Sequence, residues 1–132
     1  EAGIKRSVMI LNGLGGRSLT AQHAVNSARL INATQPEYLA TLVVSFPRGM
    51  ERFKARYPDF EPLDQRGLFE EMERFLSELE LESTIFRSDH ASNYLVLKGV
   101  LNKDKERLLA QVRTAIEAPE LANLRPEWMR AL

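Results

Sequence analysis

Short runs of apolar and β-branched residues alternate along the chain with longer segments whose apolar residues recur at helical spacing. The runs at residues 8–11, 38–46 and 83–86 are too short for helices and predict strands. The first run lacks polar alternation, so we expect this strand to be covered on both faces, as in parallel sheets. Helical spacing predicts helices over residues 18–35, 67–81 and 102–118. The pattern predicts an α/β fold with about three parallel strands alternating with helices.

Local signals set the expected helix ends. Ser18 or Thr20 is placed to cap the first helix, and Asn102 the last one, because their side chains accept backbone N–H groups. Residues 1–4 have the composition of the last turn of a helix, with Gly3 at its end. We therefore expect that a helix body, and with it part of a longer protein, precedes Glu1.

In the carboxyl-terminal third, the sequence predicts a turn and a buried tryptophan. Residues 94–97 lead away from the third strand, and Lys98 and Gly99 are expected to form a turn. Trp128 is expected to anchor the tail, because an indole buries a large apolar area.

A glycine-rich loop follows the first strand and precedes a helix. Asn12, Gly13, Gly15 and Gly16 stand where parallel α/β sheets bind ligands, at the carboxyl end of a strand. The loop matches neither the dinucleotide fingerprint nor the phosphate-binding P-loop. A tight strand-to-helix turn without a ligand explains the pattern equally well.

A long irregular segment covers residues 47–66, in which aromatic and basic residues are mixed. Such a mixture suits single-stranded nucleic acid, where bases stack and phosphates pair. Acidic residues, including Glu51, Asp59, Glu61 and Asp64, dilute the positive charge. We therefore favour a folded-down loop with a short helix at residues 51–57 over a nucleic-acid surface.

The densest polar cluster follows the third strand, at residues 87–93. Arg87, Ser88, His90 and Asn93 are candidates for ligand contact there, because polar residues at a strand exit belong to the site end of an α/β fold. The alternative is turn chemistry, in which such side chains satisfy backbone groups. A lone His90 without nearby cysteine or histidine is a poor metal ligand.

The glutamates of the helix at residues 67–81 invite a search for catalytic carboxylates. Glu70, Glu71 and Glu73 are expected on its solvent face, where Glu70 and Arg74 form a helix-stabilising i, i+4 pair. No residue of the chain is assigned a catalytic role on pattern.

Composition narrows the function classes. The chain has 132 residues, 18 basic and 18 acidic side chains and no cysteine. One domain, residues 1–132, is expected. Absence of cysteine excludes disulfides, thiol catalysis and cysteine-ligated metal within these residues, and the balanced charge gives no field toward nucleic acid. No run reaches the roughly 20 apolar residues of a membrane span, and a cytoplasmic location is expected.

Several segments together resemble one family. The sequence is similar to the carboxyl-terminal part of radical S-adenosylmethionine (radical SAM) proteins, in the Fe–S oxidoreductase group related to oxygen-independent coproporphyrinogen III oxidase. The resemblance covers nearly the whole chain, and the stretch at residues 86–99, FRSDHASNYLVLKG, is its most specific part. The other segments that carry it are EAGI at residues 1–4, VMILNGLGG at 8–16, NATQPEY at 32–38 and LRPEW at 124–128.

The resemblance implies a fragment of a partial TIM-like (β/α) barrel whose amino-terminal part, with a CxxxCxxC loop, holds a [4Fe–4S] cluster that binds and cleaves S-adenosylmethionine. That motif is absent here, so this chain is not expected to hold the cluster or bind the cofactor alone, and the missing amino-terminal half is its implied partner. By the resemblance, cofactor or substrate contacts come from eight residues: Asn12, Gly13, Gly15, Gly16, Arg87, Ser88, His90 and Asn93.

Two other function classes fit the pattern. One is a non-enzymatic α/β interaction module, and the other is a small nucleotide-binding domain at the glycine-rich loop. A barrel fragment with an uncovered interior is expected to self-associate through its exposed sheet edge.

Overall fold

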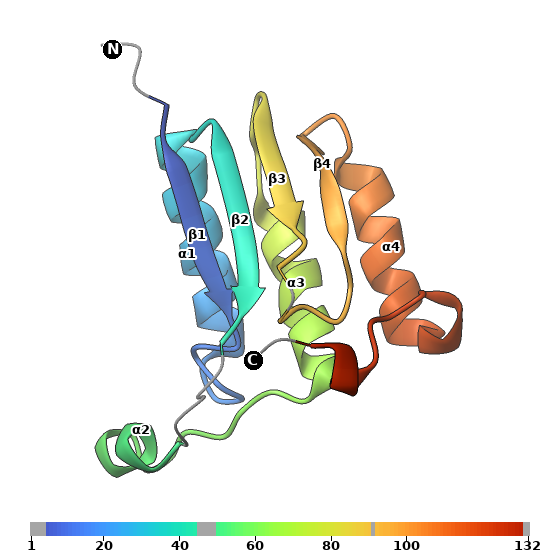
Figure 1. Ribbon diagram of the computed structural model, residues 1–132. Helices are drawn as coiled ribbons and strands as arrows, with labels where there is room; N and C mark the ends of the chain where they lie inside the picture. Colours follow the sequence, from blue (N-terminus) through green and yellow to red (C-terminus); the bar gives the residue numbers. More distant parts are fainter. Residues whose placement is uncertain (1–4, 45–49, 91, 131–132) are drawn as a thin grey trace.

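The computed structural model describes residues 5–44, 50–90 and 92–130. Its centre is a single four-stranded sheet made of β1 (Ser7–Asn12), β2 (Tyr38–Val43), β3 (Thr84–Ser88) and β4 (Leu97–Leu101), in that spatial order (Figure 1). The first three strands are parallel, and β4 runs antiparallel to β3. The α/β class is confirmed.

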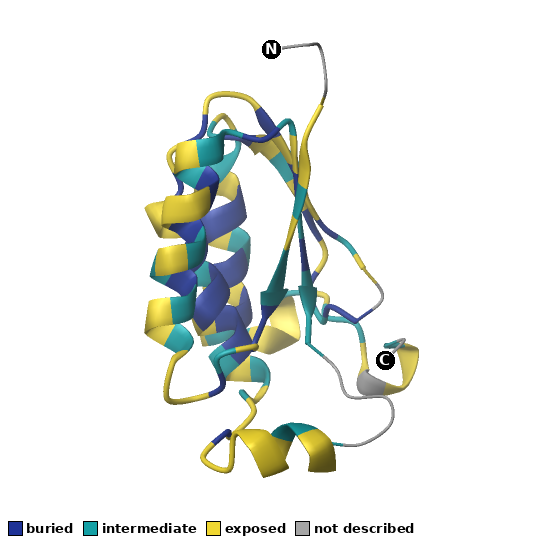
Figure 2. Ribbon diagram, turned by 90° about the vertical axis from the view of Figure 1, so that its left-hand side faces the viewer, coloured by how far each residue is buried: buried dark blue, intermediate teal, exposed yellow. Residues whose placement is uncertain are grey.

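Helices connect the strands and lie on one side of the sheet. The three long helices α1 (Thr20–Thr34), α3 (Gln65–Glu78) and α4 (Lys105–Glu117) form one layer, and the short helix α2 (Glu51–Arg56) lies beyond the carboxyl ends of β1 and β2 (Figure 2). Two 3₁₀ turns, η1 (Pro119–Leu121) and η2 (Glu127–Met129), follow α4. The short helix expected at residues 51–57 is therefore confirmed.

The core lies between the sheet and the long helices. Phe86 of β3 is fully buried against helix side chains that include Ile31, Phe75 and Leu108. Along β3 the side chains alternate, with Thr84, Phe86 and Ser88 buried and Ile85 and Arg87 exposed. This alternation is the mark of a sheet covered on one face.

The other face of the sheet is open and largely apolar. Its side chains include Met9, Tyr38, Ile85 and Val100, which are 62%, 38%, 37% and 37% exposed. No described helix covers this face (Figure 2). The expectation that the first strand is covered on both faces is therefore wrong for the described chain: the unbroken apolar run of β1 supplies both the core and the open face.

The expected turn at Lys98 and Gly99 is wrong, because both residues lie inside β4, opposite Arg87 and Phe86. A Cβ at position 99 would stand 2.9 Å from the Asp104 Cβ, so glycine lets the start of α4 approach the strand. Backbone pairing with β3 stabilises the extended conformation of these two residues, and the residue types at positions 98 and 99 do not reveal that pairing.

Three helix starts differ from expectation. Asp64, rather than Gly67, sets the start of α3, and its carboxylate accepts the Gly67 N–H at 2.7 Å. Leu19 occupies the cap position of α1 without a side-chain bond, so neither expected residue caps that helix. Asp104 precedes α4, while the Asn102 side chain accepts the Leu81 N–H at 3.0 Å instead.

Trp128 does not anchor the tail, since it is 82% exposed. Arginines hold the tail instead: Arg125 donates to the carbonyls of His90 and Asn93, each at 2.8 Å, and Arg130 donates to the Ser92 carbonyl at 2.8 Å. The helix end expected at residues 1–4, and the last two residues of the run at 38–46, lie outside the described residues.

Candidate functional site

Polar residues gather at the carboxyl ends of the parallel strands. Asn12 ends β1, Thr41 lies in β2, Ser88 ends β3, and Ser92 and Asn93 follow in the next loop. All five are at most 4% exposed. Because neighbouring parallel strands end at the same edge, residues distant in sequence meet there.

A buried carboxylate organises this edge. Glu71 of α3 is 3% exposed, and its Oε1 accepts the Gly13 N–H at 2.8 Å and, at 3.4 Å, the Asn12 side-chain amide. The hydroxyl of Thr20 donates to its Oε2 at 2.7 Å. One carboxylate thus joins β1, the glycine-rich loop, α1 and α3, which is the hydrogen bonding that a buried charge requires.

The expectation that Glu71 lies on the solvent face of its helix is wrong, because its side chain is buried. The sequence does indicate that Glu71 is buried, because Leu68, Glu71, Met72 and Phe75 stand at i, i+3, i+4 and i+7, on one face of the helix. That spacing defines the buried stripe, and all four side chains are buried. A polar residue inside an apolar stripe marks a buried network.

Residues of the polar loop after β3 form hydrogen bonds with the carboxyl end of β2. Thr41 donates its hydroxyl to Ser88 Oγ at 2.7 Å, and Asn93 Nδ2 donates to the Thr41 carbonyl at 3.0 Å. The Ser92 hydroxyl accepts the Val43 N–H at 3.2 Å. Ser88 and Asn93 therefore form hydrogen bonds within the protein, as the alternative to ligand contact predicts.

His90 is exposed, and its ring orientation is fixed by Ser92. Its Nδ1 accepts the Ser92 N–H at 3.1 Å and lies 2.9 Å from the Ser92 hydroxyl. Because Nδ1 is an acceptor, the neutral ring carries its proton on Nε2. His90 thus presents an N–H donor to its surroundings, just after the end of β3.

Arg87 lies apart from this buried cluster, on the open face of the sheet. Its cross-strand neighbour is Lys98, whose charge is compensated by Asp89 at 3.7 Å. Arg87 and Lys98 are thus two exposed positive groups on the largely apolar open face, next to the carboxyl ends of the parallel strands.

The glycine-rich loop folds against its own chain. Gly16 has φ +64, and a Cβ there would stand 2.7 Å from the Glu61 carbonyl and 3.0 Å from the Phe60 ring. The Arg17 N–H donates to the same Glu61 carbonyl at 2.8 Å. Packing thus requires glycine at position 16 whether or not a ligand binds.

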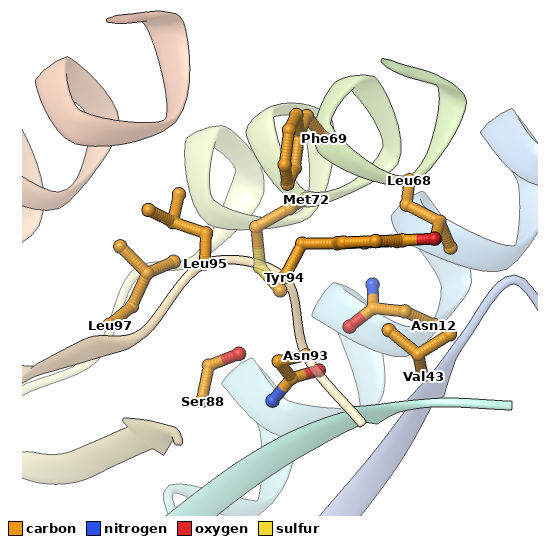
Figure 3. A pocket seen from close by; sticks show the side chains of 10 residues that line it. All are labelled: Asn12, Val43, Leu68, Phe69, Met72, Ser88, Asn93, Tyr94, Leu95 and Leu97. Atoms are coloured by element: carbon orange, nitrogen blue, oxygen red, sulfur yellow. The ribbon is translucent and has the colours of Figure 1, made fainter. Parts of the chain in front are cut away.

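A small cavity lies between α3 and the carboxyl ends of the first three strands, among the residues shown in Figure 3. Its volume is about 20 Å³, and Asn12, Ser88 and Asn93 line it together with apolar side chains, among them Leu68 and Met72. Three of the eight candidate residues therefore share one cavity, whereas Arg87 lies on the open face and the glycines belong to the loop.

The chain does not supply ligands for an iron–sulfur cluster. It has no cysteine, and the described residues contain no group of three or more His, Asp or Glu that could hold a metal ion. Nor does any described helix have the length and apolar character to cross a membrane. Without cysteine thiolates, these residues do not fit the cluster that the resemblance implies.

Comparison with protein-family models, with curated proteins and with solved structures finds no match for this chain.

Proposed function

We propose that this chain is the carboxyl-terminal segment of a radical SAM enzyme of the Fe–S oxidoreductase group, and that it forms one wall of the cofactor or substrate pocket. The observation that carries the proposal is the open face: three parallel strands with helices on one side leave a largely apolar face, and Arg87 lies on that face one residue before the carboxyl end of β3. In a partial barrel, this face is the interior and that end carries the active site.

The motif that carries the resemblance supports the same proposal. FRSDHASNYLVLKG, at residues 86–99, runs from β3 through the polar loop into β4. It supplies Ser88 and Asn93 to the buried cluster and Arg87 to the open face. The Arg87 guanidinium, beside Lys98 on this largely apolar face, suits an anionic group, such as the carboxylate of a cofactor or substrate.

The family's [4Fe–4S] cluster supplies reductive cleavage of S-adenosylmethionine when it is bound by the CxxxCxxC loop. The residues of this chain position its loops and supply charge. Glu71 holds the glycine-rich loop, Ser92 orients the His90 ring, and Arg87 offers charge. The proposal includes a cytoplasmic location and the missing amino-terminal half as the chain's partner.

The deciding experiment begins with the gene. An in-frame CxxxCxxC motif upstream of the Glu1 codon is expected, and an authentic start codon directly before Glu1 would contradict the proposal. The full-length protein, reconstituted with iron and sulfide under anaerobic conditions, is then assayed for 5′-deoxyadenosine formation.

Arg87→Ala is expected to weaken cofactor or substrate use in that assay, whereas Arg29→Ala, at an exposed site on α1, serves as the control. Unchanged kinetics in Arg87→Ala would show that this face of the sheet does not contact the cofactor or substrate. Saturable, tight ATP binding by the isolated chain would instead favour a nucleotide-binding domain.

A further inference from the structure

We propose that the cavity between α3 and the carboxyl ends of the first three strands is a binding site for a single water molecule, which links the β1 end to the β3 end of the sheet. The inference rests on the geometry of the described residues and is independent of the proposed enzyme class.

The first observation is an acceptor without a donor. Asn12 is 4% exposed, and among the buried side-chain atoms of the described residues its Oδ1 is the one with no hydrogen-bond partner. Its Nδ2 is directed at the Glu71 carboxylate, at 3.4 Å. Rotating the amide would place Oδ1 against that carboxylate, so the oxygen is held facing away from Glu71, into the cavity (Figure 3). Buried acceptors of this kind are satisfied by protein or by ordered water.

The second observation is the size and lining of the cavity. A volume of about 20 Å³ exceeds the roughly 10–15 Å³ that one water needs and is too small for an organic ligand. Ser88 and Asn93 border the same space as Asn12, and most of the remaining lining side chains are apolar. A water there donates to Asn12 Oδ1 and bonds to the Ser88 hydroxyl, which gives it the polar partners that buried waters require.

A metal ion is a poorer occupant of the same space. Calcium and magnesium require about six or more oxygen ligands, whereas four residues with polar side-chain groups, Asn12, Ser88, Asn93 and Tyr94, line this cavity and the rest of its wall is apolar. The cavity therefore selects a small neutral hydrogen-bond donor.

The water would join two hydrogen-bond networks. Asn12 belongs to the network of Glu71, Gly13 and Thr20, and Ser88 belongs to that of Thr41 and Asn93. These networks hold the glycine-rich loop and the polar loop, respectively. Bound water thus couples the two loops that carry most of the candidate site residues.

A high-resolution crystal structure of the protein tests the proposal directly. One electron-density peak is expected within about 2.7–3.2 Å of both Asn12 Oδ1 and Ser88 Oγ, and it is expected to vanish in Asn12→Leu, whose side chain fills the space without an acceptor. An empty cavity, a closed cavity with Asn12 bonded elsewhere, or a peak with the short multiple contacts of a cation would overturn the proposal.

A solution measurement covers the case in which Asn12→Leu does not fold. In the unaltered protein, a nuclear Overhauser cross-peak between water and the Asn12 side-chain amide is expected. Ser88→Ala is expected to weaken it and to speed hydrogen exchange at the Gly13 amide, whereas Ser77→Ala, at an exposed site on α3, leaves both unchanged. If Ser88→Ala changes neither quantity, the coupling through water is refuted.

Discussion

The Glu71 carboxylate accepts the backbone N–H of Gly13 at 2.8 Å across 58 positions of sequence. This bond fixes the start of the glycine-rich loop to a helix from the second crossover of the sheet. The loop's position therefore depends on a residue that belongs to another part of the chain.

Glu71→Leu is expected to lower the free energy of unfolding by about 2–3 kcal/mol, because it leaves buried donors without an acceptor. Glu71→Gln is expected to cost less, since an amide oxygen still accepts the Gly13 N–H while its nitrogen donates to the Thr20 hydroxyl. Urea unfolding measures both. Glu70→Leu, at the exposed neighbouring position, is the control, and an equal loss there would refute the role of Glu71.

Gly16→Ala is expected to destabilise the fold by about 2 kcal/mol, because position 16 combines a left-handed φ with a Cβ contact at 2.7 Å to a carbonyl. Gly67→Ala is the matched control, since its nearest contacts, at 3.1 Å, are side-chain atoms of Asp64 and Leu63. Thermal unfolding of the two variants separates them. Equal midpoints would show that the loop relaxes without cost.

Arg125→Ala is expected to loosen the polar loop, because Arg125 Nη1 donates to the carbonyls of both His90 and Asn93. We expect a stability loss of about 1 kcal/mol and faster hydrogen exchange at the Asn93 amide. Arg113→Ala removes an exposed pair with Glu73 at 2.9 Å and serves as the control. Unchanged exchange at Asn93 would show that the tail does not hold the loop.

Asp104 is expected to make stability depend on pH. A hydrogen bond from the Val100 N–H, aided by Arg107, lowers the pKa of its carboxyl group below the ordinary value. The folded state therefore favours the charged form, so its contribution is present above the unfolded-state pKa and is lost as pH falls through the folded-state pKa. Urea unfolding of Asp104→Asn across acidic pH is expected to lack this component, and Glu106→Gln to retain it.

The open face is expected to drive self-association of the isolated chain. Ile85→Lys places a charge on that face and is expected to shift sedimentation toward the monomer. Leu30→Lys is the control, because Leu30 is 55% exposed on α1, away from the sheet. If both variants sediment like the unaltered chain, the open face is not the contact surface.

Local signals in the sequence were sufficient for the main elements of the fold. Apolar runs located the first three strands because a buried strand needs consecutive β-forming side chains. Helical spacing located α1, α3 and α4, and the polar residues at strand ends marked the edge where the candidate site lies. These features depend on residues that are close in sequence, so the spacing of apolar and polar residues is enough to predict them.

Only the tertiary structure decided which faces are covered and which polar groups meet. The apolar run of β1 is compatible with burial on both sides, yet Met9 is 62% exposed, because the three long helices pack on the opposite face. Lys98 and Gly99 lie in a strand because β3 offers an edge for pairing, and Glu71 is buried because Gly13 and Thr20 approach it from other elements. Each outcome rests on a contact between segments far apart in the chain, whose energy no local pattern contains.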